Sequence, residues 1–213
     1  MFDPVSVAII VIPAVLAVTV HEIAHGWMAL KFGDDTAASR GRLSLNPLRH
    51  VDPLGTIVVP AVLWFGGEWL FGTRIFFGWA KPVPVMWQRL SPLRPAIAAV
   101  AAAGPLANLG MALAWFALGT LCARFGLVVL MYMCQAGVVF NLAIMIINLL
   151  PIPPLDGSRI VTAMLPPTWA ARYNRHEMLG LMLVALLLLA GALDWLFKPL
   201  LRGLINWLTN VAT

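Results

Sequence analysis

The stretch AVTVHEIAHGWMAL, residues 17–30, places two histidines and a glutamate in an apolar run. His21 and His25 are four residues apart, so a helix would set both imidazoles on one face, where they could bind the same zinc ion. Glu22 could then accept a proton from an attacking water. The alternative is a set of ordinary polar helix residues, but an unpaired glutamate inside a membrane is unfavourable by about 2.5–3.5 kcal/mol. The pattern therefore favours a hydrolytic zinc site.

A third zinc ligand should come from elsewhere in the chain, because a catalytic zinc ion usually has three protein ligands and a water. Asp156, in NLLPIPPLDGSR at 148–159, is the candidate because it follows the end of another apolar run. Considered alone, Asp156 could equally be a helix cap or a turn residue. We predict one zinc ion per chain, bound by His21, His25 and Asp156.

The proline-rich sequence PIPP at 151–154 cannot continue a regular helix. At membrane depth, unwound backbone is tolerated only beside a protein-lined or watery cavity, such as an active site. Asn148 lies two turns before Asp156 and could donate a hydrogen bond to an oxyanion or to the substrate backbone. Its alternative role is an interhelical hydrogen bond. Asn148 is therefore a candidate catalytic residue beside Glu22.

The composition indicates a membrane protein. Of the 213 residues, 61% are hydrophobic and only 11% are charged, which does not suit a soluble domain with a polar surface. The 14 Lys and Arg exceed the 9 Asp and Glu because acids are few, so nucleic-acid binding is not expected. Cys122 and Cys134 form neither a CxxC motif nor a His-Cys grouping. We expect a multi-pass protein of the cell membrane with the lipid bilayer as its surroundings.

Three apolar runs are long enough to span a bilayer, which takes about 20 residues. They cover about 5–30, 96–121 and 127–150 and should form a helical core. A shorter apolar run at 178–197 and an amphipathic one at 199–211 predict one or two C-terminal helices. The last of these could span the membrane or lie in its interface.

Residues 54–72 contain an apolar stretch that is short for a span, with Lys and Arg residues both before and after it. The positive-inside rule places both basic groups in the cytoplasm, so we predict a re-entrant or interfacial hairpin. Helices 5–30 and 127–150 then both run inward. The two histidines and Asp156 should therefore meet near the cytoplasmic side of the membrane.

Two short membrane-associated strands are predicted around this hairpin, within residues 36–90. RGRLSLN at 40–46 alternates polar and apolar residues, and RIFFGWAKPVPV at 74–85 is aromatic and extended. Pro82 and Pro84 lack N–H groups, so the second strand should be a sheet edge or a rigid wall. An unwound substrate helix could pair with such an edge.

Several segments resemble the site-2 protease family of intramembrane zinc metalloproteases, and in particular its small bacterial members. The segments that carry the resemblance are HEIAH at 21–25, GRLSLNPLRHVDPLG at 41–55, GWAKPVPV at 78–85, AAAGPLAN at 101–108 and NLLPIPPLDG at 148–157. Their order along the chain is that of the family. The resemblance covers roughly residues 5 to 165.

The resemblance implies an all-α polytopic membrane protease, with residues 1–213 as a single domain. Some family members carry a PDZ domain between the second and third core helices, but only a few residues around Arg124 connect these helices here, so we expect neither a PDZ nor a CBS domain. The resemblance also implies these site residues: the zinc ligands His21, His25 and Asp156, the general base Glu22, and the polar helper Asn148. The substrates would be membrane proteins cut in or near their transmembrane segments. Asn108 is expected to pack near the site, in a helix whose small residues allow close approach.

Two non-proteolytic functions could use the same ligands, namely metal transport and a zinc-binding scaffold. A transporter needs a polar path across the bilayer, yet the predicted spans carry no charge except Glu22 at an inner end. The intact glutamate between the histidines favours hydrolysis over a silent scaffold.

Overall fold

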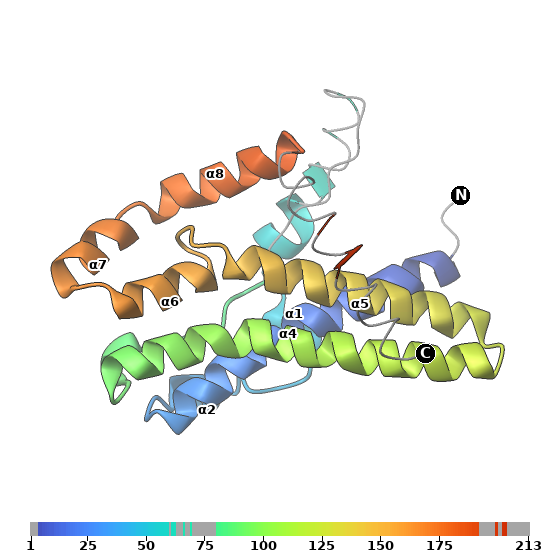
Figure 1. Cartoon of the computed structure of the whole chain (residues 1–213), viewed down its shortest axis with the longest axis horizontal. Helices are drawn as coiled ribbons and strands as arrows, with labels where there is room; N and C mark the ends of the chain where they lie inside the picture. The colour runs from blue at the N-terminus through green and yellow to red at the C-terminus, as the bar shows by residue number, and fades with distance from the viewer. Residues whose placement is uncertain are drawn as a thin grey trace.

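Three long helices form the body of the protein in this computed structural model, which describes residues 4–59 and 80–191 and the isolated positions 61, 62, 66, 69, 199, 202 and 203. They are α1 (Pro4–Lys31), α4 (Leu93–Arg124) and α5 (Val128–Leu149), and they run side by side along the long axis (Figure 1). The shortest has 22 residues, and at about 1.5 Å per residue it exceeds the bilayer core of about 30 Å. All three are long and apolar enough to cross a membrane. The predicted core helices are confirmed, and the chain is an all-helical polytopic membrane protein.

Small residues let the three helices approach closely. Ala112 of α4 packs with Val138 and Leu142 of α5 in one buried cluster. A Cβ at Gly137 of α5 would lie 2.5 Å from the Trp115 ring, so only glycine fits there. In lipid, where the hydrophobic effect does not drive helices together, such close packing is what holds a bundle.

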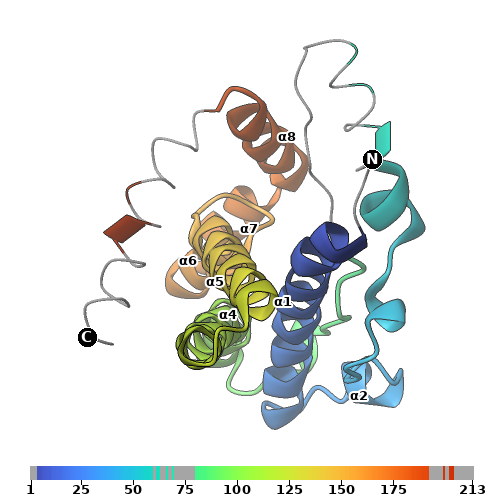
Figure 2. The same ribbon diagram turned by 90° about the vertical axis from the view of Figure 1, so that its right-hand side faces the viewer.

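The helix directions bring the predicted site residues to the same end of the bundle. The Ser91 N–H donates to the Phe32 carbonyl at 3.0 Å, so α4 begins beside the end of α1. At the far end, residues 125–127 connect α4 to α5, and Gly126 takes a φ of +66° that suits glycine. No further domain is inserted between these helices. Figure 2, which looks along the bundle, shows α1 beside α5.

In the continuously described stretch up to residue 191, three shorter helices follow α5. They are α6 (Asp156–Met164), α7 (Pro167–Asn174) and α8 (Glu177–Leu189). The Arg159 guanidinium donates to Glu177 at 2.7 Å, which ties α6 to α8. The predicted helix at 178–197 is present as α8 as far as Leu189, and residues 192–197 lie outside the described residues, as does most of the predicted segment 199–211.

The region between α1 and α4 contains short helical turns. They are α2 (Thr36–Ser39), η1 (Pro47–His50), the π-helical turn η2 (Pro53–Val58) and η3 (Trp87–Arg89). The predicted hairpin at 54–72 begins with η2, whose backbone N–H groups are capped by the Asp52 carboxylate. Most of the rest of that hairpin lies outside the described residues.

The strand predicted at 40–46 is wrong, because this segment consists of turns and bends. Residues 80–85 are not a strand either, while 74–79 lie outside the described part of the chain. The two segments do meet, but through side chains: Arg42 donates to the Lys81 carbonyl at 2.9 Å. A strand needs a backbone ladder, and Pro82 and Pro84 cannot donate to one.

Candidate active site

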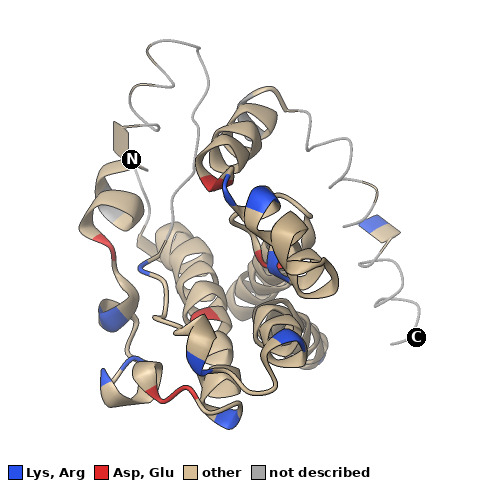
Figure 3. Cartoon of the chain, turned by 90° about the vertical axis from the view of Figure 1, so that its left-hand side faces the viewer, with Lys and Arg blue, Asp and Glu red and all other residues tan. Residues whose placement is uncertain are grey.

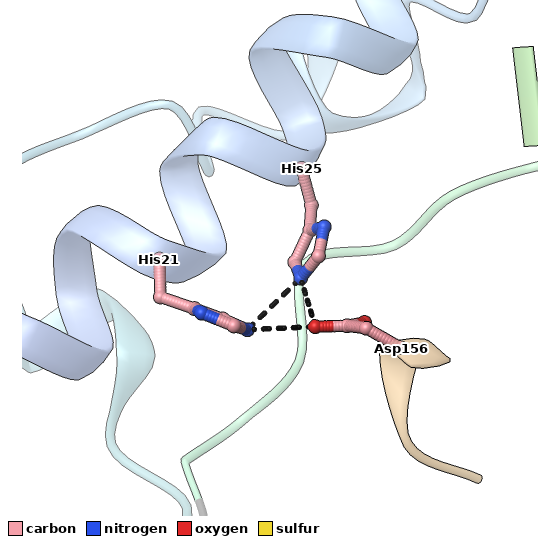
Figure 4. A group of neighbouring side chains, drawn as sticks. All are labelled: His21, His25 and Asp156. Atoms are coloured by element: carbon pink, nitrogen blue, oxygen red, sulfur yellow. Dashed lines mark hydrogen bonds and ion pairs between the residues drawn. The ribbon is translucent and has the colours of Figure 1, made fainter. Parts of the chain in front are cut away.

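Three side chains, from His21, His25 and Asp156, converge on one another, as Figure 4 shows. His21 and His25 come from α1, and Asp156 is the first residue of α6. The two Nε2 atoms lie 3.0 Å apart, and the Asp156 Oδ2 lies 3.2 Å from His21 Nε2 and 3.3 Å from His25 Nε2. These side chains are 7%, 12% and 17% exposed, so the cluster is shielded from solvent.

The other ring nitrogen of each histidine faces a hydrogen-bond acceptor. The Nδ1 of His25 donates to the Val100 carbonyl at 2.7 Å, and the Nδ1 of His21 donates to the Asn108 Oδ1 at 2.6 Å. A neutral imidazole that carries its proton on Nδ1 presents a lone pair at Nε2. Both Nε2 atoms are therefore ready to bind a cation.

The cluster fits a zinc ion. Ligand atoms about 2.0–2.1 Å from a tetrahedral zinc ion lie about 3.3 Å from one another, close to the three separations observed here. The Asp156 Oδ2 is buried and receives no hydrogen bond. A buried carboxylate oxygen that faces two imidazole lone pairs is costly unless a cation lies between them.

Burial raises the pKa of the Asp156 carboxyl, but interaction with protonated imidazoles of His21 and His25 outweighs burial and holds that pKa below its usual value. A bound metal ion would take the place of the imidazole protons. Because zinc binds the deprotonated carboxylate, the charge state suits a ligand.

Gly104 of α4 makes room for the two imidazoles. A Cβ at this position would lie 2.5 Å from both His21 Cε1 and His25 Nε2. Gly104 and Asn108 are four residues apart and so share one face of α4. This face supplies both the space for the histidines and a hydrogen-bond partner for one of them.

Glu22 lies beside the cluster on α1, where its Oε2 accepts a hydrogen bond of 2.6 Å from the Val83 N–H. Asn148, in contrast, donates its side-chain amide to the Ile144 carbonyl of its own helix at 3.1 Å. The structure therefore brings His21, His25 and Asp156 together, places Glu22 next to them, and directs the Asn148 amide donor into α5.

Sequence reasoning underestimated Asn108, for which only packing was expected. Asn108 is fully buried, accepts from His21, and donates its Nδ2 to the Asn141 Oδ1 at 2.9 Å. Asn141 in turn donates to the Gly137 carbonyl at 2.8 Å. The available signal was an amide side chain inside an apolar span, one turn after a glycine, because polar residues there need partners.

We expect Asn108→Ala to lower zinc affinity about 10- to 100-fold, the usual effect of losing a group that orients a metal-binding histidine. Asn108→Asp keeps an oxygen toward His21 and should retain much tighter binding than the alanine variant. Titration of the metal-free proteins with zinc against a competing chelator measures both. Equal affinities for wild type and Asn108→Ala would refute this role.

A His-Glu-x-x-His motif on a spanning helix, together with an aspartate that converges on its two histidines, defines the protein as an intramembrane zinc metalloprotease. The family model described as Peptidase family M50 matches residues 122–191. No solved structure matches this chain. Because a relative named as a zinc metalloprotease is also 35% identical to this chain over most of both lengths, the chain belongs to this peptidase family, the site-2 protease family.

Curated relatives match along most of the chain. The protein named "Putative zinc metalloprotease YwhC" of Bacillus subtilis is 35% identical over 91% of this chain and 86% of its own length. Proteins named "Putative zinc metalloprotease Rip2" are more distant: that of Mycobacterium tuberculosis is 28% identical over 92% of this chain and 71% of its own length. The Rip2 of Mycolicibacterium smegmatis is 29% identical over 91% of this chain and 72% of its own length.

Proposed function

We propose that this protein hydrolyses peptide bonds in or near the transmembrane segments of other membrane proteins, as a single catalytic domain over residues 1–213. His21, His25 and Asp156 would hold one zinc ion, Glu22 would be the general base, and Asn148 would be a polar helper toward the substrate. The observation that carries the proposal is the convergence of three potential ligand atoms that lie 3.0 to 3.3 Å apart.

The residues of the site divide the chemistry between them. When bound, zinc lowers the pKa of a water to about 7 and polarises the scissile carbonyl. Glu22 takes the proton from the attacking water and delivers it to the nitrogen of the leaving amine as the C–N bond breaks. Asn108 and the Val100 carbonyl hold the imidazoles, so the ligand set does not have to reorganise during the reaction.

The active site would lie near the cytoplasmic side. In the described stretches 4–59 and 80–191, every Lys and Arg except Arg124 belongs to the end where α1 finishes and α4 begins. Figure 3 faces this end and shows the basic positions around the helix termini. The positive-inside rule assigns such an end to the cytoplasm. The Ser91 N–H donates to the Phe32 carbonyl, so the chain between α1 and α4 begins and ends at the same end of the bundle. We therefore also propose that residues 54–72 enter and leave the membrane on this side.

Metal transport and a non-proteolytic scaffold are not favoured. Within the described spanning helices, the charged residues other than Glu22 lie near helix ends, at Lys31, Arg94 and Arg124. Conduction needs a polar path between the two faces, and these residues do not form one. The relatives named as zinc metalloproteases also match over most of their lengths.

The test is zinc-dependent proteolysis by the purified, lipid-reconstituted protein. We expect about one zinc per chain and cleavage of a model single-span substrate that a chelator abolishes and added zinc restores. Mass spectrometry of the products should place the cut in or near the span. Cleavage that persists after complete zinc removal would refute the proposal.

A further inference from the structure

Residues 81–86, KPVPVM, form a strap that packs against the inner half of α1 beside Glu22. The Val83 side chain is only 7% exposed. Its Cγ1 lies 2.8 Å from where a Cβ at Gly26 would be, and Gly26 is one helical turn after Glu22. The strap is thus seated on the helix that carries both histidines.

Three backbone N–H groups of the strap donate hydrogen bonds to the rest of the protein. Lys81 donates to the His50 carbonyl at 2.9 Å, Val83 to the Glu22 Oε2 at 2.6 Å, and Met86 to the Asp34 Oδ2 at 2.6 Å. Pro82 and Pro84 have no N–H. The Val83 amide is therefore the donor that the strap directs at the catalytic motif.

The strap is rigid around Val83. A proline has a fixed φ near −65°, and the residue before a proline is driven to extended backbone. Both constraints act here, because Val83 stands between two prolines and precedes one of them. The two prolines therefore restrict the backbone conformations on both sides of the Val83 N–H.

Both ends of the strap are anchored by polar contacts. Asp34 is fully buried and also accepts hydrogen bonds from the hydroxyl and the N–H of Thr36. Burial raises the pKa of the Asp34 carboxyl, but the bonds from Thr36 and Met86 outweigh burial and keep it below its usual value. Asp34 therefore stays an anion, which forms stronger hydrogen bonds than a neutral acceptor. Arg42 holds the other end through the Lys81 carbonyl.

We propose that the Val83 N–H is a positioning group for Glu22. This N–H holds one oxygen of the Glu22 carboxylate so that the other oxygen faces the attacking water. This rests on the proposed role of Glu22 as general base. An unrestrained glutamate samples many rotamers, whereas an N–H bonded to a carboxylate selects one orientation. Orientation matters because a displacement of about 1 Å can reduce a catalysed rate about 100-fold.

Two substitutions at residue 83 distinguish the effect of the backbone N–H from the effect of the side chain. Val83→Pro removes the N–H, and we expect kcat to fall about 10- to 100-fold while KM and zinc content are retained. Val83→Ala keeps the N–H and loses the side-chain packing, so it should cleave about tenfold faster than the proline variant. Equal losses in the two variants, or a wild-type kcat in Val83→Pro, would overturn the proposal.

A second measurement depends neither on cleavage nor on how well Val83→Pro folds. In NMR spectra of protein labelled with ¹⁵N-valine in lipid nanodiscs, the signal of the Val83 amide is assigned as the one that disappears in Val83→Ala. We expect slow exchange of this amide with D₂O, and exchange about tenfold faster or more in Glu22→Ala, with no change at Val138 in α5. Unchanged exchange at Val83 would refute the contact. An intact contact in a protein without zinc-dependent cleavage would instead refute the proposed function.

Discussion

Glu22→Gln should retain its zinc and lose proteolysis, with kcat lower by about 10²- to 10⁴-fold, the range that general acid–base catalysis usually contributes. Glutamine preserves the size of the side chain and an oxygen that can accept from the Val83 N–H. It cannot accept a proton from the attacking water. Zinc content by atomic spectroscopy and single-turnover cleavage of a reconstituted single-span substrate measure the two effects separately.

The matched control is Glu177→Gln, which neutralises an acid at the same end of the molecule. Glu177 pairs with Arg159 at 2.7 Å, and its side chain is 44% exposed. Ion pairs as exposed as this one contribute little to the stability of a protein, so the cleavage rate of Glu177→Gln should stay within about twofold of wild type. Equal kcat values for Glu22→Gln and wild type would exclude Glu22 as the general base. Loss of zinc in Glu22→Gln would show that the residue supports the metal site instead.

Gly104→Ala should abolish tight zinc binding, because a methyl group would overlap His25 Nε2 and His21 Cε1 at 2.5 Å. The methyl group and the imidazoles cannot both keep their positions, and metal sites tolerate ligand displacements of only about 0.2 Å. We expect zinc affinity to fall about 100-fold or more, and proteolysis with it. Chelator-competition titration of the metal-free protein measures the affinity.

Gly110→Ala is the matched control in the same helix, because a Cβ there would contact nothing within 4 Å. This variant should bind zinc and cleave like wild type. Overpacking can also destabilise a bundle by about 1–3 kcal/mol, so thermal unfolding of both metal-free variants is part of the experiment. Wild-type zinc affinity in Gly104→Ala would contradict the geometry of the site.

The helical core was predictable because long apolar runs and their flanking charges are local features of the chain. All three predicted spans appear, with their ends displaced by at most three residues. The strand at 40–46 was predicted from alternation alone and is absent. In that segment, side chains satisfy backbone groups that a ladder would otherwise pair: Arg49 donates to the Gly41 carbonyl at 2.5 Å, and the His50 ring bonds the Ser44 carbonyl at 3.0 Å.

At the site, too, some features follow from local sequence and others only from the packing of the folded chain. The spacing of His21, Glu22 and His25 indicates zinc chemistry because a helix converts four residues into one turn, and the parity of the spans brings Asp156 to the same end. The local patterns of Asn148 and Asn108 indicate that both amides need partners, but they do not show which of the two approaches a histidine. That depends on how α4 and α5 are rotated about their axes.

The sequence alone determines that this is a membrane protein with three core spans and a zinc-type motif, and it indicates Asp156 as a third candidate ligand. The tertiary structure decided what surrounds these residues. Asn108 and Val100 hold the imidazoles, Gly104 leaves room for them, and Val83 bonds Glu22. Hydrophobicity and helical periodicity are local properties of the sequence. Contacts between residues 61 to 87 positions apart, in contrast, form only when close packing fixes the rotation and the separation of the helices.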